Sequence, residues 1–301
     1  MATPEQFDIA IVGGGLVGAS LACALAPLGY SILMLEKTER RAASQPSYDD
    51  RTLALSHSSC KILESLGLWP GLSEHATAIR QIIATELGRP GRVELSAAEM
   101  GLEAFGHVVE ARAFGSVVLE QLDQLESVTV YCPAAVEKVN TTETHGELMV
   151  SGRDAPIHAR LIVAADGAAS AVRDMMGIAV KSRDYGQTAV ICNITPEQVH
   201  EGRAFERLTA TGPFAVLPHV GSRCGLVWSM DSESAEAAME MDEADFLAAA
   251  QERFGNELGG FTRMGRRSSY PLKLVRAVQD IHQRVVVIGN AAHTIHPVGA
   301  Q

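Results

Sequence analysis

The sequence predicts an α/β fold in which a mostly parallel sheet is interrupted by a smaller antiparallel sheet. Three observations support this prediction. A glycine-rich turn, Gly13–Gly18, follows a short apolar run near the N-terminus. An apolar run typical of a buried parallel strand returns at 285–288. Between them, residues 189–230 contain short alternating strands that are separated by glycine- and proline-containing turns.

The glycine-rich turn has the spacing of a dinucleotide-binding motif. Gly13 permits a sharp turn, Gly15 lets a pyrophosphate approach the backbone, and Gly18 lets the next helix pack closely on the strand. The N-terminus of that helix directs free N–H groups and a positive dipole end at the phosphates. Glu36 follows about 20 residues later, where a carboxylate binds ribose hydroxyls and repels a 2′-phosphate. The motif therefore suits FAD or NAD(H) rather than NADP(H).

Two further motifs mark the same predicted domain. Residues 166–173, Asp-Gly-Ala-Ala-Ser-Ala-Val-Arg, follow the apolar run 161–165. Residues 289–293, Gly-Asn-Ala-Ala-His, follow the apolar run 285–288. Three motifs in this order, with an acid after the first, indicate FAD rather than a glycine-rich turn that matches by chance.

The remaining elements are predicted from hydrophobic periodicity and from the residues that begin and end each run. Pro27 and Gly29 end the first helix, and Asp242 and Gly255 bound the last one. Helices are predicted over 16–28, 58–66, 112–125 and 242–254. Strands are predicted over 9–12, 31–35, 79–86, 92–95, 108–110, 128–131, 136–139, 147–150, 161–165, 189–194, 203–208, 214–217, 225–230 and 285–288.

The pattern of strands changes near Lys181, where mixed alternation replaces continuous apolar runs. This change predicts a Rossmann-like FAD-binding domain interrupted by a smaller antiparallel-sheet domain for the substrate. The FAD-binding domain is assigned to residues 1–72, 103–181 and 266–301. The substrate domain is assigned to residues 73–102 and 182–265.

Composition and charge exclude several classes of protein. The chain has 301 residues, of which 47% are hydrophobic, which is enough for two domains. The net charge of −11 excludes nucleic acid as an expected partner. Residues 9–35 carry no charge, but three glycines and Pro27 divide them, so we expect neither a transmembrane span nor a signal peptide. The five scattered cysteines are predicted to be reduced core residues of a cytoplasmic protein.

With these motifs in this order, the sequence resembles the class A flavoprotein aromatic hydroxylases of the para-hydroxybenzoate hydroxylase fold. The stretch from Arg203 to Trp228 is similar to the ubiquinone-biosynthesis branch of that family. The resemblance implies an FAD-dependent monooxygenase that hydroxylates a polyprenylated phenol with NADH or NADPH and O₂, through a flavin C4a-hydroperoxide. A hydroxylase of a soluble aromatic acid and a non-catalytic FAD-binding scaffold subunit stay open as alternatives.

The resemblance also implies which residues hold the cofactor. Arg51 matches an arginine near the flavin and is the candidate catalytic residue; its alternative is a surface salt bridge with Asp49 or Asp50. Asn290 stands where most of the family has aspartate, so it keeps an acceptor oxygen and loses the charge. The candidate cofactor-binding residues are Gly13, Gly14, Gly15, Leu16, Val17, Gly18, Glu36, Lys37, Arg51, Arg112, Asp166, Gly167, Gly289, Asn290 and Pro297.

Two further groups of residues are candidates for a metal site or for contact with the substrate. His293 and His296 have the spacing of a metal pair, but no third ligand stands nearby in the sequence, so no metal site is expected. Glu206 and Arg207 are neighbours on a predicted strand and so face opposite sides. One of them is expected to line the substrate cavity, and the sequence does not decide which.

The implied substrate also sets expectations about partners and location. The expected partners are the prenylated phenol and other ubiquinone-biosynthesis proteins, in the cytoplasm, with peripheral contact with the inner membrane as an alternative. The sequence stops at Gln301 in a predicted loop, so we expect a C-terminally truncated chain with little or no activity; measurable turnover would contradict this. The choice between NADH and NADPH, the ring position, the prenyl length and the oligomeric state stay open.

Overall fold

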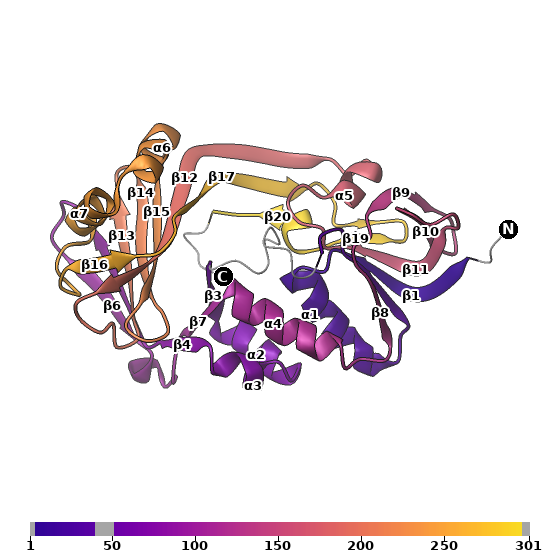
Figure 1. Ribbon diagram of the computed structural model, residues 1–301, viewed down its shortest axis with the longest axis horizontal. Coiled ribbons are helices and arrows are strands. Elements are labelled where there is room, and N and C mark those ends of the chain that lie inside the picture. The colour runs from indigo at the N-terminus through magenta and orange to yellow at the C-terminus, as the bar shows by residue number, and fades with distance from the viewer. Residues whose placement is uncertain (1–3, 40–50, 297–301) are drawn as a thin grey trace. The chain divides into compact units, whose positions relative to one another are not determined.

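The chain contains one mainly parallel and one mainly antiparallel sheet, as the change of strand pattern near Lys181 predicts. The structure is a computed structural model that describes residues 4–39 and 51–296 (Figure 1). The chain divides into a first unit, Met1–Asp49, Phe114–Arg183 and Lys273–Ile295, and a second unit, Asp50–Ala113, Asp184–Leu272 and His296–Gln301. Two of the boundaries fall inside the long strands β12 (Val180–Pro196) and β17 (Ser268–Ala277). The division into a cofactor domain and a substrate domain stays a prediction.

The first unit contains the predicted parallel sheet. Among the described residues the strand order is β18-β19-β11-β1-β2-β8, and the strands from β19 to β8 run parallel. The hairpin β9–β10 continues the sheet antiparallel to β11. The strands are β1 (Glu5–Val12), β2 (Ile32–Leu35), β8 (Val128–Tyr131), β9 (Val136–Thr141), β10 (Gly146–Val150), β11 (Ile157–Ala164), β18 (Ile281–His282) and β19 (Val285–Val287).

The continuous apolar runs of the sequence become the buried centre of this sheet. Ala10, Leu33 and Ile162 are fully buried, and they belong to β1, β2 and β11. Strands that are covered on both faces must be apolar at nearly every position, which is why these runs do not alternate. Helix α1 (Leu16–Leu25), the short helix α5 (Ala171–Met175), the 3₁₀ turn η4 (Gly289–Ala291) and the short strand β20 (His293–Thr294) complete this unit.

Helix α1 ends earlier than the prediction of 16–28. The α-helix stops at Leu25, and a 3₁₀ turn, η1 (Ala26–Leu28), follows it. Pro27 has no N–H to donate, and Gly29 adopts a left-handed φ of 79°, so the chain tightens and then turns. The predicted stop signals are therefore right, and only the helix type in the last turn differs.

The second unit contains the predicted smaller sheet, with strand order β6-β5-β13-β14-β15-β12 and with β16 and β17 beside β12. The pairs β5–β6, β13–β14, β14–β15 and β12–β15 are antiparallel, whereas β5 and β13 run parallel. A three-stranded sheet, β3-β7-β4, and the helices α2 and α3 belong to the same unit. Helix α4 (Ala111–Leu122) begins in this unit and continues in the first. The other elements are β3 (Thr52–Ser56), α2 (His57–Ser65), α3 (Trp69–Ser73), β4 (Ala76–Ile79), β5 (Gln81–Glu86), β6 (Arg92–Ser96), η3 (Ala98–Met100), β7 (Gly106–Glu110), β13 (Arg203–Thr209), β14 (Gly212–Pro218), β15 (Cys224–Asp231), α6 (Ser232–Glu240), α7 (Glu243–Phe254) and β16 (Phe261–Met264).

Aromatic side chains fill the core between this sheet and helices α6 and α7, which lie over one of its faces (Figure 1). Phe214 on β14 is fully buried and lies between Trp228 and Phe254, with ring centroids 5.4 and 6.4 Å away. Helix α7 begins and ends where the sequence predicts. Asp242 caps it by accepting a hydrogen bond from the Asp245 N–H, and Gly255 follows its last residue.

Several sequence predictions in this unit were incomplete, since β3, α3, β16 and β17 were not predicted. The single strand predicted over 79–86 is two strands, β4 and β5, which belong to different sheets. The chain crosses between these sheets at Arg80, whose N–H donates to the carbonyl of Gly202 at 2.8 Å instead of to a β4 or β5 neighbour. Helix α6 was not predicted, although Asp231 caps it by accepting from the Ser234 N–H at 2.9 Å.

Four of the five cysteines are buried, as predicted for core residues, and Cys132 is half-buried. All five cysteines are free thiols. Burial raises the pKa of Cys192 and of Cys224 to about 12, so neither is a reactive thiolate at neutral pH. Over the stretches that the structure describes, every helix is too short or too polar to cross a bilayer.

Candidate functional site

The three motifs meet at one edge of the first unit's sheet, at the carboxyl ends of parallel strands. Three backbone hydrogen bonds hold the segments together there: from Ala165 N–H to Val12, from Gly13 N–H to Leu35, and from Ile288 N–H to Ala164, at 2.7, 2.8 and 2.9 Å. Loops at this edge of an open α/β sheet are the usual place for a ligand. Motifs that are far apart in sequence therefore form one site.

Two glycines of the first motif stand where no side chain fits. Gly13 has a φ of +106°, and a Cβ atom there would lie 2.4 Å from the Ala165 carbonyl oxygen. A Cβ at Gly18 would lie 2.0 Å from the Gly13 carbonyl oxygen. The turn and the helix are thus packed against backbone atoms of the first and second motifs.

The N-terminus of α1 is open to a ligand. Gly15 is its N-cap residue in an extended conformation, its first turn holds no acid, and no side chain among the described residues caps the helix. The first N–H groups of a helix have no acceptor within the helix, so here they suit phosphate oxygens. Gly289, from the third motif, faces this turn, since a Cβ there would lie 3.1 Å from the Val17 side chain. Leu16 is half-buried and Val17 is exposed.

Glu36 is buried at the end of β2, with its carboxylate against the glycine-rich turn. Its Oε2 accepts a hydrogen bond from the Gly14 N–H, and its Oε1 accepts one from the Thr38 N–H, both at 2.7 Å. Each carboxylate oxygen has a second lone pair, so both can still accept from ribose hydroxyls. Lys37 is exposed beside it. The position fits the predicted role of an acid at the adenosine end of FAD.

Asp166 offers an unused acceptor beside the first motif. Its Oδ2 accepts from the Val172 N–H at 3.2 Å, whereas its Oδ1 is buried and has no partner among the described residues. A buried acceptor without a partner is rare in folded proteins, and a ligand hydroxyl or water would satisfy it. Gly167, which follows, has a φ of +86°. The residues present at this edge therefore fit the polar groups of FAD.

Arg173 joins the second motif to the third. Its side chain is 6% exposed, and its Nη1 donates to the carbonyl of Ala291 at 3.1 Å. Ser170 caps the short helix α5 by accepting from the Arg173 N–H at 3.0 Å. Asn290 is exposed at the turn next to Ala291. The buried arginine thus fixes the turn that presents Asn290.

The two arginines predicted to approach the flavin lie together in the second unit. The Ala111 N–H donates to the carbonyl of Arg51 at 2.9 Å, and Arg112 is the exposed residue that follows in α4. The Arg51 guanidinium lies over the Tyr270 ring, 5.1 Å from its centroid. Pro297 lies outside the described residues, as do Asp49 and Asp50, the alternative partners of Arg51.

Glu206 and Arg207 lie on opposite faces of the second unit's sheet, as predicted for neighbours on a strand. Arg207 faces helix α7, where its Nη1 donates to the carbonyl of Arg253 at 3.0 Å. Glu206 lies on the opposite face of the sheet, beside Ala84 and Ala215 in the strand register. Its Oε1 is buried without a partner among the described residues, and burial raises the pKa of its carboxyl to about 7. Glu206 is therefore the residue available on the face that helices α6 and α7 leave uncovered.

We expect Glu206 to make the protein less stable as the pH rises from about 4.5 to about 7. The native carboxyl keeps its proton up to its pKa of about 7, whereas the unfolded one releases it near the ordinary value of 4.5. The stability that the bound proton contributes is complete below about pH 4.5 and is lost by about pH 7. Glu206→Gln should therefore stabilise the protein by about 1–3 kcal/mol at pH 8 and hardly at all at pH 4.5. Urea unfolding at both values measures this.

The matched control for this prediction is Glu252→Gln, a change at an exposed position of α7. It should leave the pH dependence of stability unchanged, since it alters an exposed side chain and no buried one. Equal behaviour of the two variants would show that Glu206 is not buried in the native protein.

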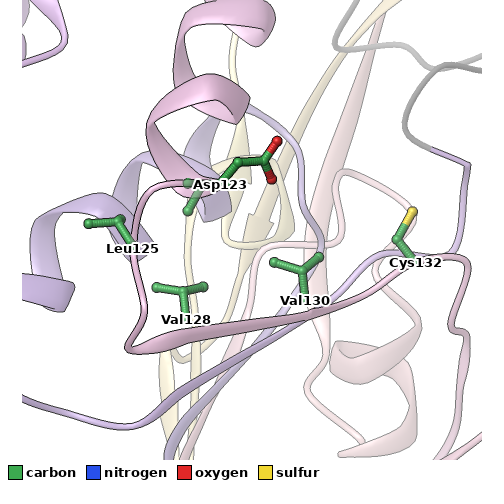
Figure 2. A pocket seen from close by; sticks show the side chains of 6 residues that line it. Asp123, Leu125, Val128, Val130 and Cys132 are labelled. Carbon is green, nitrogen blue, oxygen red and sulfur yellow. The ribbon is translucent and has the colours of Figure 1, made fainter.

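A hollow of about 460 Å³ opens beside the end of α4 and strand β8 (Figure 2). Aliphatic side chains and the Asp123 carboxylate line it. None of the lining residues belongs to the three motifs. The lining residues are Leu122, Asp123, Leu125, Val128, Val130 and Cys132.

Several known proteins are similar to this chain in sequence, and others are similar to it in fold. The FAD binding domain family matches residues 6–301. The chain is 34% identical to "Ubiquinone hydroxylase UbiL" of Rhodospirillum rubrum, over 98% of this chain and 68% of that protein. It is 30% identical to "3-demethoxyubiquinol 3-hydroxylase" of Escherichia coli, over 99% of this chain and 76% of that protein.

A solved structure confirms the fold class. The crystal structure of p-nitrophenol 4-monooxygenase PnpA from Pseudomonas putida matches with a TM-score of 0.79 and 21% identity, over 98% of this chain and 75% of that chain. The predicted fold class, a Rossmann-like α/β fold interrupted by a smaller sheet, is therefore right. From the three converging motifs and these relatives, we conclude that the chain belongs to the FAD binding domain family and is an FAD-dependent monooxygenase.

Proposed function

We propose that this chain hydroxylates the aromatic ring of a polyprenylated phenol in ubiquinone biosynthesis. The observation that carries the proposal is the convergence of the three motifs on one sheet edge, with Glu36 and the unpartnered Asp166 oxygen facing it. The substrate class is taken from the names of the relatives and from residues 203–228, which resemble 2-octaprenyl-6-methoxyphenol hydroxylases.

The reaction needs a cofactor for its redox chemistry and a protein that orients the ring. Bound FAD would accept two electrons from NADH or NADPH and activate O₂. In the overall reaction one oxygen atom of O₂ enters the ring and the other leaves as water. The residues of the first unit would bind the cofactor: the α1 N-terminus its phosphates, Glu36 its ribose and Asp166 a further hydroxyl.

In the second unit we propose that Glu206 faces the phenol. The neighbouring residues in the strand register, Ala84 and Ala215, are small and apolar, which suits an aromatic ring. A carboxyl with a pKa of about 7 can hydrogen-bond to the phenol hydroxyl or take its proton at neutral pH. Loss of that proton makes the ring richer in electrons, which favours oxygen transfer to it.

The polyprenyl chain of the proposed substrate also bears on the location of the enzyme in the cell. Such a substrate dissolves in a bilayer, so we propose that the chain acts in the cytoplasm at the surface of the inner membrane. Other ubiquinone-biosynthesis proteins are the partners that would present the substrate or take up the product.

The proposal is tested with the purified, FAD-loaded chain, a prenylated phenol and isotopically labelled O₂. We expect at most slow oxidation of NADH or NADPH by this chain, and the hydroxylated product that it forms should carry one labelled oxygen atom in its new hydroxyl, as measured by mass spectrometry. Hydrogen peroxide formed without a labelled product would contradict the proposal.

The same assay separates the two alternative functions. Flavin reduction accelerated by small phenolic acids, and not by prenylated phenols, would favour a hydroxylase of a soluble aromatic acid. Bound FAD that neither NADH nor NADPH reduces would favour a non-catalytic scaffold subunit.

Glu36→Ala is expected to weaken FAD binding about 10- to 100-fold. The carboxylate is held by two backbone N–H groups and would bind the ribose, and hydrogen bonds to a charged group contribute about 1.5–3 kcal/mol. FAD titration followed by flavin fluorescence measures the change. Glu36→Gln is the matched control, since it keeps one acceptor oxygen and should lie between the parent and the alanine variant. Unchanged affinity in Glu36→Ala would remove Glu36 from the site.

A further inference from the structure

Two histidines and a glutamate gather on the first unit's sheet, at the opposite end of β11 from the three motifs. They are His145, Glu147 and His158, and their ligand atoms all lie within 4.8 Å of one another. We propose that these three side chains form a binding site for a divalent transition metal, with Zn²⁺ as the preferred ion. The site is distinct from the flavin site and from the hydroxylation reaction.

The strand register places the three side chains on one face. Glu147 on β10 pairs directly with His158 on the antiparallel strand β11. His145 precedes Glu147 by two residues, so its side chain points to the same face of the strand. The flanking residues Leu148 and Ile157 point the other way, into the hydrophobic core. The packing of Leu148 and Ile157 in the core therefore holds the backbone of β10 and β11, which carries the ligands, in place.

The distances suit one small cation. The Glu147 Oε1 lies 3.5 Å from the His145 Nε2 and 3.9 Å from the His158 Nε2. Two ligands of a tetrahedral Zn²⁺, each about 2.0–2.1 Å from the metal, are about 3.4 Å apart. Closing the His158 edge to that value needs a shift of about 0.5 Å in the side chain. The two imidazole rings lie 4.3 Å apart between centroids with 33° between their planes, so they must also turn for both nitrogens to face one ion. The side chains are 22–31% exposed, which leaves one side for a water ligand.

The second ring nitrogen of His145 is already held in the way a metal ligand requires. Its Nδ1 lies 2.9 Å from the Thr144 Oγ1 and 3.2 Å from the Thr142 Oγ1. When Nδ1–H donates to a threonine hydroxyl, Nε2 presents a lone pair toward Glu147. That Nε2 is buried and has no hydrogen-bond partner among the described residues. Metal-binding histidines usually donate their other N–H to a protein acceptor in this manner.

The turn that carries His145 is also fixed from a neighbouring segment. The Gln283 Nε2 donates to the carbonyl of Thr142 at 3.0 Å, and the Arg284 Nε donates to the carbonyl of Glu143 at 3.1 Å. Both donors use side chains from the loop between β18 and β19. A ligand held on a fixed turn loses less conformational entropy when it binds a metal.

Charge and ligand type point to Zn²⁺. With neutral imidazoles the cluster carries one negative charge, from Glu147, which attracts a cation. Arg160, on the same face of β11, is paired with Asp8 at 3.3 Å. Two imidazole nitrogens and one carboxylate form the ligand set of many open zinc sites. A bound ion would join the β9–β10 hairpin to β11 and so stabilise the first unit.

The test is a calorimetric titration of the metal-stripped full chain with ZnCl₂, repeated with CoCl₂ and visible absorption. We expect one Zn²⁺ per chain, and Co²⁺ bands of a four-coordinate site. In Glu147→Gln and in His158→Ala the affinity should fall at least about 100-fold. The matched control is His75→Ala, a change at an exposed histidine of the second unit, which should leave Zn²⁺ binding unchanged.

Each outcome decides the proposal. Glu147→Gln is close to isosteric, so circular dichroism should show it folded, and its loss of Zn²⁺ binding then reports the ligand. A rise in the unfolding temperature with Zn²⁺ that is absent in Glu147→Gln would support the cross-link. Absence of stoichiometric Zn²⁺ binding by the parent chain, or equal binding by the parent and both ligand variants, would overturn the proposal.

Discussion

Replacing Gly18 by alanine is expected to abolish FAD uptake and to destabilise the chain by about 3 kcal/mol or more. The new Cβ atom would lie 2.0 Å from the Gly13 carbonyl oxygen and 3.2 Å from the Ala165 side chain. Neither neighbour can retreat, because the Gly13 N–H is bonded to Leu35 and the Ala165 N–H to Val12. The helix must therefore lift away from the strand, and its N-terminus would leave the phosphate position.

Urea unfolding and FAD titration together measure this effect. The control is Ser20→Ala in the same helix, at a hydroxyl that is buried without a hydrogen-bond partner among the described residues. Removing such a group should be neutral or slightly stabilising, and FAD uptake should persist. Parent-like stability and FAD affinity in Gly18→Ala would mean that α1 does not approach the turn as described.

Phe214→Ala is expected to cost about 3–5 kcal/mol of stability, through a cavity in the core of the second unit. The ring is fully buried between Trp228 and Phe254, against helices α6 and α7. Since every neighbour is itself packed, the site cannot close over the missing volume. Thermal and urea unfolding of the purified variant measure the loss.

Two matched variants calibrate this prediction. Phe214→Leu keeps most of the volume and should lose less, about 1–2 kcal/mol. Leu208→Ala removes a side chain that is 48% exposed on the neighbouring strand, and it should cost under about 1 kcal/mol. A loss in Phe214→Ala no larger than that in Leu208→Ala would contradict the aromatic core described here.

The sequence predicts this fold best where the signals are local. The turn at Gly13–Gly18 and the bounds of α7 depend on backbone conformation and capping within a few residues, and the structure has both as predicted. The run 79–86 was predicted as one strand because it contains several β-branched residues and a turn, 88–91, follows it. Its division at Arg80 depends on pairing with Gly202, more than 100 residues away.

The sites show the same limit. The motif order predicts that Gly13, Glu36 and Asp166 belong to one cofactor, because each motif has its own signature. The pairing of Glu147 with His158 depends on the register of two antiparallel strands, which no short motif encodes. The choice of Glu206 over Arg207 required knowledge of which sheet face helix α7 covers. The features that could not be predicted are thus those that depend on packing between residues far apart in the sequence.

The central claim is that the three motifs of the first unit form an FAD site. The most direct measurement is the visible absorption spectrum of the purified chain, before and after it is incubated with FAD and freed of unbound flavin. We predict flavin bands with about one FAD per chain, lost in Gly18→Ala and kept in Ser20→Ala. A chain that is folded by circular dichroism but stays colourless after incubation with FAD would contradict the account.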